Sequence, residues 1–139
     1  MNHESITAAL QRLAIKQGAM LGNMSRPDLL LTLALAAGCL PRSAPLTEPE
    51  VNAVLKAWLA GIGAMLGVDH VELRRTLIDI GLWQRDGFGL AYQHAMSVAD
   101  AELAGYVSVL TTLDAAQIVT DARARRDAER AARKARNVR

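Results

Sequence analysis

Arginine side chains in two parts of the sequence have the chemistry to bind an anion. In the first part, Arg75 and Thr76 are predicted on the outer face of a helix, and Arg85 lies in the first part of the hairpin that follows it. Guanidinium groups donate hydrogen bonds to phosphate oxygens and to guanine, so this pattern predicts contacts with duplex DNA. Because Glu72 and Asp79 flank Arg75, a surface ion pair is the alternative interpretation.

The second part is the C-terminal segment 121–139, in which eight basic residues against three acidic ones give a net charge of +5. The remainder of the chain has a net charge of −3, so the positive charge is concentrated at one end. A basic run attracts the phosphate backbone, and a solvated tail explains the same charges equally well. Arg126 is set aside because Asp127 adjoins it. The residues predicted to contact nucleic acid here are Arg123, Arg125, Arg130, Arg133, Lys134 and Arg136.

Residues that could catalyse a reaction or bind a metal are sparse. His3, His70 and His94 are far apart and have no Asp or Glu at ligand spacing, and the single cysteine, Cys39, lies in an apolar context typical of a buried thiol. The glycine cluster at 61–67 follows a predicted helix instead of a strand, unlike a phosphate-binding loop. The sequence therefore predicts a non-enzymatic protein with no metal or cofactor.

Composition and length predict a single aliphatic domain. Only five residues of 139 are aromatic, so leucine, alanine, isoleucine, valine and methionine must form the core, which favours helices. The N-terminus has no basic n-region, and the most apolar stretch, 29–40, is too short to span a bilayer, so a cytoplasmic protein is expected. We predict one domain over residues 1–120, with a core module at about 25–94 and a helical or disordered basic tail at 121–139.

Capping signals predict where the first helices begin and end. Ser5 or Thr7 is expected to cap the first helix, which Gly22 would stop. Ser25 is expected to cap a second, apolar helix, and Gly38 to end it in a left-handed conformation. Two shorter helices are expected near the C-terminus, at about 98–110 and after Asp114, and the chain beyond residue 123 has no apolar face that would dock it.

The clearest signals lie in the middle of the chain. Thr47 and Glu50 form a capping box, and Asp69 begins a second helix that Gly81 closes as the C′ residue. Two strand-like runs follow, at 82–85 and 90–94, joined by turn residues that tolerate positive φ. The order helix, helix, hairpin predicts a winged-helix-like domain, mostly α (α+β), with additional N- and C-terminal helices.

Three strings in this module resemble the prokaryotic domain of unknown function family 2087. They are TEPEVN at 47–52, LRRTLIDIGL at 73–82, and Arg85-Asp86-Gly87 followed by Tyr92. The resemblance implies a winged-helix-like domain that occurs alone or attached to bacterial transcription regulators. Arg74 is expected near the buried edge of its helix, paired with Glu50 or Asp69. The residues expected to have structural roles are Thr47, Glu50, Asn52, Arg74, Gly81, Gly87 and Tyr92.

The sequence leaves several functions open. The first is a DNA-binding or transcription-regulatory accessory factor, which the basic tail and the resemblance favour. The alternative is a protein–protein interaction module of the same fold, which the acidic body favours. A third is a small-molecule sensor in which the apolar helix at 29–40 lines a pocket. A homodimer through the terminal helices also stays open.

Overall fold

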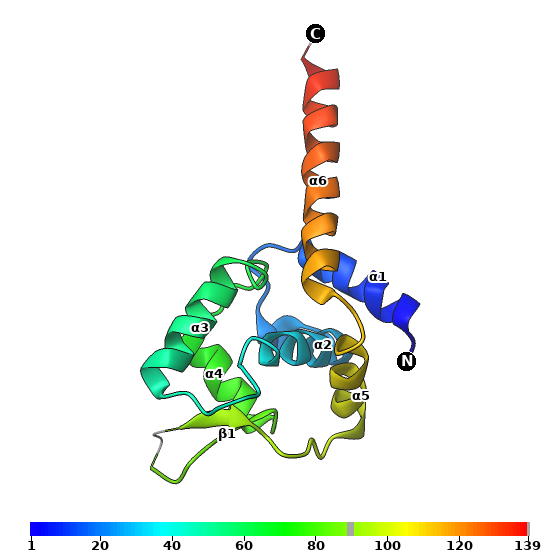
Figure 1. Ribbon diagram of the computed structural model, residues 1–139. Coiled ribbons are helices and arrows are strands. Elements are labelled where there is room, and N and C mark those ends of the chain that lie inside the picture. The colour runs from blue at the N-terminus through cyan, green and yellow to red at the C-terminus, as the bar shows by residue number, and fades with distance from the viewer. Residues whose placement is uncertain (89–90, 139) are drawn as a thin grey trace.

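The computed structural model describes residues 1–88 and 91–138 (Figure 1). The fold is mostly α with one antiparallel hairpin, and the predicted α+β class is confirmed. No single helix among the described residues has both the length and the apolar character to cross a membrane, although α5 and α6, bent by 77°, meet both criteria as a pair. The elements in chain order are α1 (His3–Ala14), a 3-10 turn (Leu21–Asn23), α2 (Arg26–Ala37), α3 (Glu48–Ala60), α4 (His70–Asp79), β1 (Trp83–Arg85), β2 (Tyr92–His94), α5 (Ala101–Leu110) and α6 (Ala115–Asn137).

The N-terminal caps of α2, α3 and α4 form where the sequence predicts them. Ser25 caps α2, and the capping box of α3 is complete because Glu50 also accepts a hydrogen bond from the backbone of Thr47, at 3.0 Å. Asp69 accepts from the backbone N–H of Glu72 at 2.8 Å and so caps α4. These side chains satisfy donors that a helix leaves unpaired in its first turn.

The predicted cap and end of the first helix are wrong, whereas Gly38 ends the second helix as predicted but without the left-handed conformation. Asn2, and not Ser5 or Thr7, caps α1, and this helix ends at Ala14 because the chain then pairs its backbone with residues 65–67. Gly38 has a right-handed φ of −66°. Successive backbone bonds three residues apart close α2 with a 3-10 turn, so no left-handed residue is needed there.

Gly81 takes the predicted left-handed conformation, with φ of +87°. Its N–H donates to Ile78 and that of Leu82 donates to Leu77, both at 3.1 Å, and Leu82 is buried behind the cap. Only glycine adopts this φ without strain, and the resulting change of direction sends the chain from α4 into β1.

The predicted hairpin is confirmed as β1 and β2, with Arg85 opposite Tyr92 and Trp83 opposite His94. Leu90, expected in the second strand, lies outside the described residues. Gly87 lies in the turn without a positive φ, contrary to expectation, and the Asp86 side chain supports that turn by accepting from the Phe88 N–H at 3.1 Å.

Leu46 adds an unpredicted backbone pairing to the hairpin. Its N–H and C=O both bond to Tyr92, at 2.9 and 2.8 Å, so the segment before α3 lies alongside β2. The apolar helix α2 is buried along most of its length, and α5 packs against it (Figure 1). The Trp83 indole, 1% exposed, donates to the C=O of Ala37 and joins the hairpin to α2.

Helix α6 docks on α1 and then extends away from the body of the protein (Figure 1). Val119 and Ala122 are buried in this contact, whereas residues 127–137 are exposed on every side. The domain boundary predicted at residue 121 therefore falls within one continuous helix. The docked part of the chain continues to about residue 126.

Candidate nucleic-acid interface

The outer face of α4 presents Arg75 to solvent. Leu73 and Leu77 are fully buried on the opposite face, and this amphipathic spacing leaves Arg75 exposed with no salt bridge to any residue the structure describes. The hydroxyl of Thr76 donates to the C=O of Glu72 at 2.8 Å. The donor of Thr76 is thus engaged within α4, and Arg75 is the available cation of this face.

Arg74 directly precedes Arg75 in α4, yet its guanidinium is enclosed by neighbouring side chains. The side chain is 13% exposed and pairs with Glu48 at 3.2 Å, while also donating to the amide oxygen of Asn52. The ring of Tyr92 lies 5.8 Å from the guanidinium carbon, and the Tyr92 hydroxyl donates to Glu48 at 3.1 Å. These contacts join α3, α4 and β2 into one polar cluster.

The carboxylate partner of Arg74 differs from the prediction. Glu50 and Asp69 were expected, but Glu50 accepts from the backbone of Thr47, and Asp69 accepts from that of Glu72. Both carboxylates are committed to helix N-termini, which leaves Glu48 to neutralise the arginine.

A hollow of about 430 Å³ lies between α4 and the hairpin. Its three arginines face two carboxylates, so its charges are mixed. Arg85 is exposed at the edge of the hairpin, and no salt bridge to it occurs in the described part of the chain. We call this hollow the α4 surface, and it is lined by Glu48, Arg74, Arg75, Ile78, Asp79, Arg85 and Tyr92.

Arg123, predicted to contact nucleic acid, instead holds two helix ends together. Its guanidinium donates to the carbonyl oxygens of Ala14 at 2.9 Å, Gly61 at 2.9 Å and Ile62 at 2.8 Å. Carbonyls at helix C-termini have no partner within the helix and carry partial negative charge, which suits a cation. Burial, followed by the charge of Arg126, lowers the pKa of Arg123. The structure therefore gives Arg123 a structural role, and its contact with nucleic acid stays a prediction.

Four other arginines of α6 form a groove with α1. This groove has a volume of about 550 Å³ and contains five arginines against a single carboxylate, Glu129. Arg126 pairs with Asp127 at 3.2 Å, which agrees with its omission from the predicted contacts. No salt bridge forms to the other four arginines within the described residues. We call this the basic groove, and its arginines are Arg12, Arg125, Arg126, Arg130 and Arg133.

The predicted nucleic-acid residues thus lie on two separate surfaces. Arg75, Thr76 and Arg85 belong to the hairpin end of the molecule, whereas the basic residues of α6 lie along the helix that projects from the opposite end (Figure 1). Lys134 and Arg136 are exposed near the end of that helix. The fold does not combine the two sets into one patch.

The histidines and the cysteine are also dispersed. His3 bonds to the hydroxyl of Thr112 at 2.7 Å, and His94 bonds to the C=O of Leu40 at 2.7 Å. Across residues 1–88 and 91–138, no three His, Cys, Asp or Glu side chains lie close enough together to hold a metal ion. Burial raises the pKa of the Cys39 thiol to about 12.

Residues 24–94, half of the chain, match the profile of the bacterial family described as uncharacterized protein conserved in bacteria (DUF2087). The protein belongs to this family. The matched segment contains α2, α3, α4 and both strands, so the DUF2087 module includes the α4 surface and excludes the basic groove. No curated protein and no solved structure matches the chain.

Sequence reasoning missed the surroundings of two arginines. Arg12 belongs to the basic groove but lies more than 100 positions from its neighbours in α6, so no local pattern indicates it. The role of Arg123 did have a signal. Arg123 follows the buried Val119 by four positions, which places it on the docked face of the helix.

Proposed function

We propose that this DUF2087 protein is a cytoplasmic, DNA-binding accessory factor of transcription regulation, with a winged-helix-like module. The order of the elements supports the winged-helix assignment: α2 is followed by the segment at Leu46 that pairs with β2, and then by α3, α4 and the hairpin. In such domains a short strand precedes the second helix, and the helix before the hairpin enters the major groove. Here that helix is α4, which carries Arg75.

The observation that carries the DNA proposal is the charge of the basic groove. From residue 124 to 137, helix α6 has six basic side chains and two acidic ones, and Arg12 adds a further cation from α1. Arginines that lack a carboxylate partner are free to replace the counterions of a phosphate backbone, which is the dominant contribution to non-specific affinity. We therefore assign the phosphate contacts to the basic groove and the exposed end of α6.

The test is salt-dependent binding of the full chain to random-sequence duplex DNA, measured by fluorescence anisotropy. The triple variant Arg130→Gln, Arg133→Gln and Lys134→Gln removes three exposed cations of α6. Each lost phosphate contact reduces the slope of log K against log salt by about 0.9, so the slope should fall by about 2 to 3. The double variant Arg75→Gln and Arg85→Gln is the control and should change the slope by less than about 0.9, the value of one phosphate contact.

A protein-interaction module is the second candidate function. The mixed charges of the α4 surface favour it, because Glu48 and Asp79 oppose the approach of a phosphate backbone. The same titration separates the candidates. Absence of DNA binding by the full chain at low salt would refute the DNA proposal, and a slope that falls only in the Arg75 and Arg85 variant would move the contacts to the α4 surface.

A further inference from the structure

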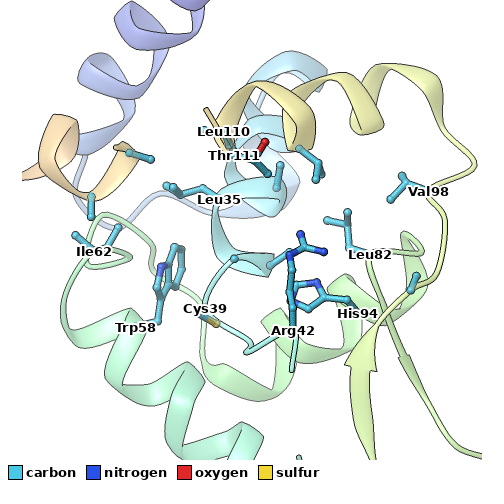
Figure 2. Close-up of a pocket in the computed structure, with 17 residues that line it drawn as sticks. Leu35, Cys39, Arg42, Trp58, Ile62, Leu82, His94, Val98, Leu110 and Thr111 are labelled. Atoms are coloured by element: carbon cyan, nitrogen blue, oxygen red, sulfur yellow. The ribbon is translucent and has the colours of Figure 1, made fainter. Parts of the chain in front are cut away.

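An apolar cavity lies where α2, the hairpin and α5 meet, and its volume is about 440 Å³. This volume falls within the range of roughly 300–1,000 Å³ that is usual for small-molecule sites. Leu35, Trp58, Leu82 and Leu110 contribute apolar walls from four different elements or connections (Figure 2). The cavity is separate from the α4 surface and from the basic groove, since it shares no lining residue with either.

The position of Trp58 in this wall depends on a close approach to the backbone. A Cβ atom added at Gly63 would overlap the indole ring of Trp58, so only glycine leaves room for the ring at this point. The indole and Ile62 lie together at one side of the cavity (Figure 2). The glycine at position 63 therefore lets the Trp58 ring form part of the wall, where it presents a large aromatic surface to an occupant.

Arg42 supplies a positive charge to this mostly apolar cavity. The side chain is exposed, and no carboxylate of the described chain forms a salt bridge with it. Arg42 and His94 lie side by side between Trp58 and Leu82 (Figure 2). Both residues line the cavity, and burial together with the charge of Arg42 lowers the pKa of His94, although the bond to Leu40 opposes this shift.

We propose that this cavity binds a small carboxylate with an apolar body, such as a medium-chain aliphatic acid. The apolar body would displace water from the walls formed by Leu35, Trp58 and Leu82, and the carboxylate would pair with Arg42. A cationic amphiphile is disfavoured by Arg42, and a neutral one gains only the apolar contacts. Because Leu82 and His94 border the hairpin, an occupant would contact the same hairpin that carries Arg85.

The test is titration of the full chain with octanoate and with octan-1-ol at pH 7.5, followed by isothermal calorimetry and tryptophan fluorescence. Octanoate should bind saturably with one site per chain, and octan-1-ol about tenfold or more weakly, because it lacks the charge that pairs with Arg42. Trp58→Phe should remove most of the fluorescence change while calorimetry still detects binding.

Two variants and their controls locate the site. Arg42→Gln should weaken octanoate about tenfold and leave octan-1-ol unchanged, whereas Arg75→Gln, outside the cavity, should alter neither. Ala116→Phe fills the cavity from an exposed position of α6 and should abolish binding of both probes, while Thr120→Phe on the same helix should not. Melting temperatures confirm that each variant is folded.

Three results would overturn the proposal. They are no saturable binding of octanoate by the folded chain, equal affinity for octanoate and octan-1-ol, and octanoate binding that Arg42→Gln or Ala116→Phe leaves intact. None of these results depends on whether the protein binds DNA.

Discussion

The α4 surface and the basic groove both contain arginines at helical spacing, but the surroundings of the guanidinium groups differ. On the α4 surface, Arg74 is enclosed by Glu48, Asn52 and Tyr92, and the acidic side chains nearly balance the basic ones. In the basic groove, one carboxylate faces five arginines. The comparison shows that an arginine's role follows from its nearest carboxylates and carbonyls more than from the charge of its segment.

Arg123 belongs to neither region and joins α6 to the C-terminal ends of α1 and α3, so its replacement should produce the largest loss of stability. Arg123→Ala leaves the carbonyls of Ala14, Gly61 and Ile62 without their donor, and we expect a loss of about 2–3 kcal/mol. Urea unfolding followed by circular dichroism measures this loss. Arg130→Ala, on the exposed part of the same helix, should change stability by less than about 0.5 kcal/mol. Similar midpoints for the two variants would remove the structural role assigned to Arg123.

Arg74 and Arg75 provide a narrower test, because they are adjacent in sequence and differ in burial. Arg74→Met should cost roughly 1–2 kcal/mol, since it removes the partner of Glu48 and the cation on Tyr92. Arg75→Met should be nearly neutral. A double-mutant cycle with Glu48→Gln should give a coupling energy of about 0.5 kcal/mol or more for Arg74 and close to zero for Arg75. Equal coupling would contradict the polar cluster.

The smallest effect should appear in acid, at the capping box of α3 in the DUF2087 module. The N–H of Thr47 donates to Glu50 and lowers the pKa of that carboxyl. Its contribution to stability is present above the unfolded pKa near 4.5 and is lost as the pH falls through the lower folded value. Arg123 and its carbonyl partners do not titrate in this range.

This acid effect is measured by NMR chemical shifts of residues 47–51 and of the α1 and α6 contact between pH 6 and pH 3. We expect the shifts at the start of α3 to change as the pH falls through the lowered pKa of Glu50, and those of the α1 and α6 contact to change less. Glu50→Gln keeps the capping geometry and should remove that part of the pH dependence. A Glu50→Gln chain with the unchanged acid response at residues 47–51 would show that another carboxylate is responsible.

Local signals in the sequence predicted the structure correctly where the interacting residues lie within a few positions of one another. The capping box of Thr47, the left-handed Gly81 and the hairpin after it were predicted because each depends on a short-range backbone requirement. The end of α1 and the pairing of Leu46 with Tyr92 were not, because their partners lie more than 40 positions away. The local spacing of apolar and polar residues contains no information about such distant partners.

The amino-acid sequence by itself determined the helical composition, the family and the concentration of positive charge near the C-terminus. Only the tertiary structure decided which charges are available. Packing of α6 on α1 assigns Arg123 to helix carbonyls and adds Arg12 to the basic groove, and packing of α3, α4 and β2 encloses Arg74. The physical reason is that desolvation and hydrogen bonding depend on neighbours in space, and the fold brings those neighbours from distant parts of the chain.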